Sequence, residues 1–156
     1  MITKIIASIF AFLLLSNLIY SNANSKVNNS IVIKVGNSVI SAIDIQNQIV
    51  TSLVVQKGEL NQKNIDDSKS YAIKMLINKS IKNDEILKYG VTNYSEKDLE
   101  SYIQSVAKTF DTNKKGLKEI FLKYDISFDT FVENYKTELL WNSLIYSLYK
   151  NQLNVN

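Results

Sequence analysis

Two pairs of adjacent carboxylates are the first residues of this 156-residue chain that could do chemistry. Asp66-Asp67 and Asp84-Glu85 carry the groups used in general acid–base catalysis and in binding hard metal ions. Both pairs lie where the apolar residues recur at helical spacing, and neighbouring side chains on a helix point about 100° apart. They do not converge on one ion. Capping and solvent-facing roles explain both pairs better than a metal site.

Serine and lysine side chains also occur at spacings that suggest a nucleophile and its base. Ser80 follows Lys79, and Ser70 precedes Lys74 by one helical turn. A working dyad needs an oxyanion hole and a strained turn at the nucleophile, and neither is evident around these residues. The chain also has no histidine, cysteine or arginine, which removes the imidazole, the thiol and the guanidinium. We expect no catalytic residue, no cofactor and no metal.

The charge of the chain is too small to indicate a nucleic-acid partner or an anionic membrane surface. The formal net charge is +3, and removal of a leader that contains Lys4 would lower it to +2. Lys114, Lys115 and Lys118 form a small basic cluster, with fewer cations than the phosphate contacts of a nucleic-acid site require.

The first 23 residues have the pattern of a secretory signal peptide. Lys4 supplies the positive charge, Ile5 to Leu15 is an uncharged apolar run, and Ser21-Asn22-Ala23 offers small residues at the cleavage site. The apolar run is shorter than the about 20 residues that span a membrane. We predict a signal peptide over 1–23 and one domain over 24–156, with no stable membrane insertion after cleavage. An uncleaved inner-membrane anchor is the alternative.

The start of the domain predicts a β-hairpin that leads directly into a capped helix. Apolar residues alternate over 31–35, and Gly36-Asn37 tolerates the positive φ angles of a tight turn. The chain then returns as a second strand. Ser41 and Asp44 form a capping box, in which each side chain satisfies a free amide of the new helix.

Helical periodicity predicts about five helices after this hairpin. They run from Ala42 to about Gln56, from about Asp66 to Tyr89, from a Ser95 cap to Phe110, over a short segment from Leu117 to Tyr124, and from Phe128 to about Asn151. Segments 57–64 and 111–116 separate them. In the second helix, the predicted apolar stripe includes Ile81 and Leu87. Leu153 and Val155 could end the chain as a short strand. The predicted fold class is mostly α, with a small N-terminal β-hairpin and a long last helix.

Three blocks of this sequence, in their order and spacing, resemble the SurA N-terminal domain, the core module of periplasmic chaperones. They are residues 35–45, residues 75–81 with 89–91 and Ser95-Glu96, and the series Phe128, Phe131, Tyr135, Glu138 and Leu139. The resemblance extends from about Ile31 to Val155. It implies a periplasmic holdase that shields unfolded outer-membrane proteins without ATP.

The sequence also departs from that family. Full members continue into parvulin-type prolyl isomerase domains and a closing C-terminal helix that packs on the N-terminal domain. No parvulin motif is present here, so the resemblance implies a core module without parvulin domains and does not carry over isomerase activity.

The last predicted helix holds the candidate binding residues. Leu139 to Tyr149 is apolar around much of its circumference, in a rod about 33 Å long. We expect the small domain to leave part of this surface uncovered, and a large exposed apolar patch marks an interface. The candidate client- or partner-binding residues are Tyr135, Leu140, Trp141, Leu144 and Leu148.

Three functions are compatible with these features. The leading hypothesis is a chaperone-like domain that binds unfolded outer-membrane proteins through apolar surface without catalysis. The second is an interaction module that binds no client and instead homodimerises or pairs with a separate isomerase chain. The third is a prolyl isomerase in its own right.

Overall fold

The structure is a computed structural model, and it describes residues 31–150. The predicted signal peptide over 1–23 and the predicted strand at Leu153 and Val155 lie outside the described residues. Within the described range, none of the helices combines the length and the apolar character that crossing a membrane demands.

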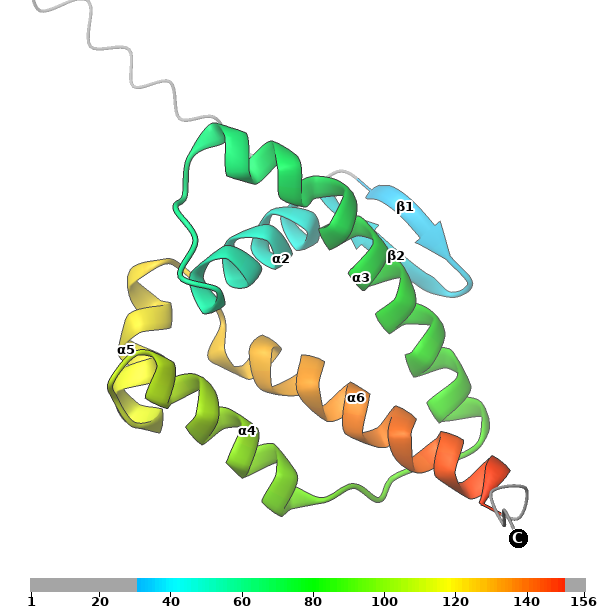
Figure 1. Cartoon of the computed structure of the whole chain (residues 1–156). Helices are drawn as coiled ribbons and strands as arrows, with labels where there is room; N and C mark the ends of the chain where they lie inside the picture. The colour runs from blue at the N-terminus through cyan, green and yellow to red at the C-terminus, as the bar shows by residue number, and fades with distance from the viewer. Residues whose placement is uncertain (1–30, 151–156) are drawn as a thin grey trace, which may run out of the picture.

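A two-stranded antiparallel hairpin followed by five helices confirms the predicted fold class (Figure 1). The elements are β1 (Ile31–Val35), β2 (Ser38–Ser41), α2 (Ala42–Val55), α3 (Gln62–Lys88), α4 (Glu96–Thr109), α5 (Lys114–Lys123) and α6 (Phe128–Tyr149). The two longest helices, α3 and α6, converge towards their C-terminal ends, whereas their N-terminal halves are splayed apart (Figure 1). The hairpin and α2 pack on α3, while α4 and α5 pack on α6.

The hairpin turn is built on one left-handed residue. Gly36 has a φ of +55°, whereas Asn37 is not among the residues with positive φ. These φ signs match a type II′ turn, which places glycine at its first central position. A Cβ on Gly36 would lie 2.7 Å from Asp84 Oδ2, so the turn also sits close against α3.

Serine side chains begin three of the helices as the sequence predicts. Ser41 Oγ accepts a hydrogen bond of 3.2 Å from the amide of Asp44, and Asp44 Oδ2 accepts one of 2.8 Å from the amide of Ser41. This is the predicted capping box. Ser95 and Ser127 accept bonds from the third helical amide in α4 and α6, in the same manner.

Two helix starts were predicted too late. α3 begins at Gln62, capped by Asn61, and therefore includes residues that were assigned to a loop. Asp66 and Asp67 consequently lie beyond the first turn, where Asp67 pairs with Lys63 at 2.8 Å. α5 begins at Lys114 because Asn113 caps it, although the segment 111–116 was predicted to be irregular. In both cases a polar first turn was read as loop, because periodicity detects apolar residues and not caps.

The predicted apolar stripe of α3 is partly wrong. Ile81 is 49% exposed and Leu87 is 77% exposed, whereas Ala72 and Ile86 are buried. The error has a physical reason. Helix α3 contacts α2, both strands of the hairpin and α6, so its buried residues do not follow a single stripe along the helix.

Two hydrophobic cores stabilise the molecule, and α2 contributes to both. The hairpin core contains Ile40, Ile45, Ile49, Leu53 and Ala72. The α4–α6 core contains Val54, Ile103, Val106, Ala107, Leu117, Phe121, Ile126 and Phe131. Leu53 and Val54 are neighbours in sequence but enter different cores, so the end of α2 joins the two halves of the domain.

The helices α2 to α5 all end in the same motif. The amide of the second residue past each C-cap donates to a carbonyl in the last turn, as in Gly58 to Leu53, Val91 to Ile86, Thr112 to Ala107 and Ile126 to Phe121. This Schellman motif needs a left-handed residue just past the C-cap, and glycine is the usual choice. Gly90 is the predicted glycine, but Lys57, Asp111 and Asp125 take this position at the other three ends.

Replacement of Asp125 by glycine should therefore stabilise the protein. Asp125 has a φ of +55°, where a Cβ is strained by about 1–2 kcal/mol. We expect Asp125→Gly to raise the free energy of unfolding in urea by about 0.5–1 kcal/mol, after the larger unfolded-state entropy of glycine is deducted. Asp125→Ala is the matched control, since it removes the same charge but keeps the Cβ. Equal stability of the two variants would contradict the assigned strain.

Candidate functional site

Helix α6 is packed on more than one side, which explains its apolar circumference. In its first half, Phe131 is buried in the α4–α6 core. Further along, Thr137 and Leu144 are also buried, on the side that meets α3. The abundance of apolar residues in this helix therefore reflects two separate contacts within one protomer.

The five candidate binding residues do not form one uncovered strip. Leu144 is only 1% exposed, so the expectation that it lies on an open surface is wrong and it is a core residue of the protomer. Tyr135, Leu140 and Trp141 are partly buried. Only Leu148 is exposed, at 43%. The wrong expectation came from counting the surface that α6 offers without knowing that α3 covers one side of it.

A polar seam joins the second half of α3 to α6. Lys82 pairs with Glu138 at 2.5 Å, and Thr137 Oγ1 donates to Asn83 Oδ1 at 3.2 Å. The Lys82 ammonium also lies 6.0 Å from the centre of the Trp141 ring. Lys79 contacts Asn134, and Lys82, about one turn further along α3, contacts Glu138, about one turn further along α6, so the two helices run in parallel through this seam (Figure 1).

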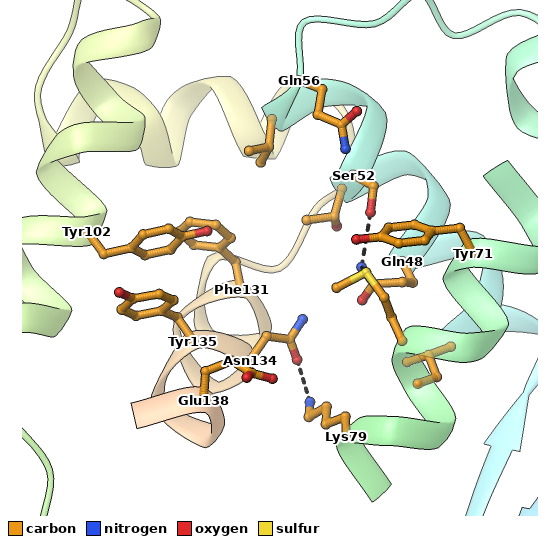
Figure 2. A pocket seen from close by; sticks show the side chains of 14 residues that line it. Gln48, Ser52, Gln56, Tyr71, Lys79, Tyr102, Phe131, Asn134, Tyr135 and Glu138 are labelled. Atoms are coloured by element: carbon orange, nitrogen blue, oxygen red, sulfur yellow. Dashed lines mark hydrogen bonds between the residues drawn. The ribbon is translucent and has the colours of Figure 1, made fainter. Parts of the chain in front are cut away.

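Next to the seam, on the side where the N-terminal halves of α3 and α6 diverge, the structure contains an open cavity of about 230 Å³. We call it the four-helix cavity, because α2, α3, α4 and α6 line it (Figure 2). Its lining residues are Gln48, Thr51, Ser52, Val55, Gln56, Tyr71, Met75, Leu76, Lys79, Tyr102, Phe131, Asn134, Tyr135 and Glu138. Tyr135 is the one residue of the predicted site among them.

One wall of the four-helix cavity is aromatic. The rings of Tyr102 and Tyr135 stack with their centroids 3.6 Å apart and their planes 6° from parallel. Phe131 lies behind them, 5.6 Å from the Tyr102 ring (Figure 2). Burial raises the pKa of Tyr102 above its ordinary value, and the neighbouring Tyr135 raises it further.

The opposite wall combines apolar and amide groups from α2 and α3. Tyr71 and Met75 line this wall and are also exposed, so they form its rim. Gln48 Nε2 donates to Ser52 Oγ at 3.1 Å and lies 3.7 Å from the Met75 sulfur. This wall therefore offers uncharged donors and acceptors beside apolar surface.

A single lysine lies at the lower end of the four-helix cavity in Figure 2. Lys79 donates a hydrogen bond to the side-chain oxygen of Asn134 on α6. Burial lowers the pKa of the Lys79 ammonium, and the charges of Glu133 and Asp44 oppose this effect. The carboxylate of Glu138 in the same cavity is already paired with Lys82.

The groups that line the cavity can bind a partner. Over residues 31–150, no three side chains of the metal-binding types gather closely enough to hold an ion. The acidic pairs are explained locally, because Asp67 pairs with Lys63 and Glu85 pairs with Lys88. What the cavity offers is aromatic faces, a thioether, neutral amides and one ammonium group.

The sequence contained one signal for this cavity. Gln48 lies between Ile45 and Ile49 on the apolar face of α2, where a polar side chain is unexpected. A buried polar group at a core-facing position needs a hydrogen-bonding partner or a polar cavity. Tyr71 and Met75 gave no such signal, because exposed apolar residues are common on helices.

A comparison of the chain with protein-family models, curated proteins and solved structures finds no match. The resemblance to the SurA N-terminal domain therefore stays a prediction, and the functional argument depends on the geometry of the chain itself.

Two leucines on α6 provide a direct test of this geometry. Leu144→Ala should lower the free energy of unfolding by about 2–5 kcal/mol, because it leaves a hole in a packed contact. Leu148→Ala should change it by about 0.5 kcal/mol or less, because that side chain is exposed. Urea unfolding followed by circular dichroism measures both. Similar losses for the two variants would mean that α3 does not cover Leu144.

Proposed function

We propose that this chain is a chaperone-like domain that holds unfolded polypeptides reversibly and catalyses no reaction. The observation that carries the proposal is the four-helix cavity, which sets aromatic and thioether surface opposite neutral amide groups. An unfolded chain presents the same two kinds of group, namely apolar side chains and backbone amides that need hydrogen-bond partners.

The size of the four-helix cavity supports weak and reversible binding. Its volume of about 230 Å³ equals the share of about eight water molecules, or roughly one or two side chains. Burying one apolar side chain contributes about 1.5–3 kcal/mol before the costs of ordering the bound segment. A holdase needs contacts of this strength, because it must release its client without ATP.

Exposed apolar side chains next to the cavity extend the surface available to a client. Tyr71 and Met75 lie on the rim, where a side chain can leave water on binding without any rearrangement of the core. Methionine adapts its shape to different partners, and tyrosine contacts apolar groups while its hydroxyl stays hydrated. Unfolded outer-membrane proteins in the periplasm are the clients that the family resemblance favours.

An aggregation assay tests the holdase function. An outer-membrane β-barrel protein is diluted from urea into buffer with a several-fold excess of the mature chain, and light scattering is followed. We expect the wild-type chain to suppress scattering and the double variant Tyr71→Ser, Met75→Ser to lose most of this effect.

Leu122→Ser provides the matched control. Leu122 is 77% exposed on α5 and does not line the cavity, so this variant removes apolar surface elsewhere and should still suppress aggregation. All variants must keep the far-ultraviolet circular dichroism of the wild type. Failure of the folded wild-type chain to suppress scattering would remove the holdase proposal.

One further observation favours the interaction module as a second candidate. Leu87, Tyr89, Tyr146 and Leu148 are all exposed near the C-terminal ends of α3 and α6. These ends converge in Figure 1, and the exposed side chains offer apolar surface to a second copy or to a separate isomerase chain.

Sedimentation velocity separates homodimerisation from client binding. A dimer formed through this surface should dissociate at least about tenfold more readily in the Leu87→Ser, Tyr146→Ser variant, because two exposed apolar anchors are lost. Val39→Ser is the control, since Val39 is exposed on the hairpin instead. A wild-type chain that sediments as a monomer at micromolar concentration would contradict the homodimer.

A further inference from the structure

We propose that the four-helix cavity selects segments of unfolded polypeptide that carry an acidic side chain, and that Lys79 pairs with this carboxylate. The inference rests on the proposed holdase function and adds a charge preference to it. The bound partner is therefore an extended acidic segment, in which apolar residues flank an aspartate or glutamate.

The charge balance of the cavity supports this preference. Two ionised groups line it, Lys79 and Glu138. Glu138 is neutralised by Lys82 at 2.5 Å, whereas none of the ion pairs between described residues includes Lys79. The Lys79 ammonium is thus the one charged group lining the cavity that has no ion-pair partner among the described residues.

The surroundings of Lys79 also favour an incoming carboxylate. The Lys79 ammonium is partly buried, and its hydrogen-bond partner Asn134 is neutral. An ammonium group has three donors, so it can bind a carboxylate oxygen and keep the bond to Asn134. Burial lowers the pKa of Lys79 by more than the charges of Glu133 and Asp44 raise it. An anionic partner would offset this effect of burial.

The walls of the cavity determine what accompanies the carboxylate. The stacked rings of Tyr102 and Tyr135 line one side of the cavity, and Met75 lines it from α3. A small inorganic anion would leave these surfaces unused. A polypeptide segment fits them better, because its apolar side chain contacts the walls while the neighbouring acidic side chain reaches Lys79.

Isothermal titration calorimetry with matched peptides tests the inference. The first probe is an acetylated and amidated nonapeptide that alternates apolar and hydroxyl residues around one central aspartate. The second has asparagine in that place and is otherwise identical. We expect the aspartate peptide to bind the wild-type chain about three- to tenfold more tightly, and added salt to reduce the difference.

Two lysine variants test whether Lys79 is responsible for the tighter binding of the aspartate peptide. Lys79→Met should bind both peptides equally, whereas Lys74→Met should keep the wild-type preference. Lys74 is exposed on the same helix and does not line the cavity, so it controls for the change in net charge. If Lys79→Met does not reproduce the wild-type circular dichroism, Lys79→Gln replaces it.

The outcomes distinguish this inference from the holdase proposal. Equal binding of the two peptides to the wild-type chain, with aggregation suppression intact, would overturn the charge preference alone. No binding of either peptide, together with no suppression, would overturn both. A third probe, the asparagine peptide with a free C-terminal carboxylate, separates chain ends from acidic side chains. A preference confined to that probe would overturn the proposal as stated.

Discussion

The contact between the second halves of α3 and α6 is the constraint on which the remaining structure depends. Lys82 and Glu138 pair across it, Thr137 bonds to Asn83, and Leu144 is sealed beneath neighbouring side chains. At the other end the N-terminal halves of the two helices are splayed apart, and α2 packs on α3 (Figure 1). The four-helix cavity lies in this separation. The candidate site thus comes from the arrangement of four helices, and not from any single unusual residue.

Helix α2 joins the two cores at the end of the molecule where α3 and α6 are splayed apart. Its last turns send Leu53 into the hairpin core and Val54 into the α4–α6 core, so that both halves of the domain are fixed to one short helix. The same helix contributes Gln48 and Ser52 to the cavity wall. This arrangement anchors one wall of the site in both cores, while the rim residues Tyr71 and Met75 are exposed. An anchored wall with an exposed rim suits a protein that binds many different segments weakly.

The predicted site and the observed site overlap in Tyr135 alone. Sequence reasoning identified α6 correctly as unusually apolar, but it attributed the excess to an uncovered face. The structure shows that α3 covers part of that face, and that the partly open surface lies where α6 faces α2 and α4. Periodicity could not distinguish the exposed residues Ile81 and Leu87 from buried ones, since both fit a helical repeat.

The amino-acid sequence by itself determined the hairpin, its Gly36 turn, the serine caps and the order and approximate length of the helices. Each of these depends on residues a few positions apart, such as the exchange of hydrogen bonds between Ser41 and Asp44. The tertiary structure alone decided that Leu144 is buried and that Lys79 faces a cavity. These outcomes depend on contacts such as Thr137 with Asn83, which are 54 residues apart in the chain. Local sequence patterns cannot specify such pairs, because the apolar face of one amphipathic helix can pack against that of many others. Only the packing of the whole domain selects which faces meet.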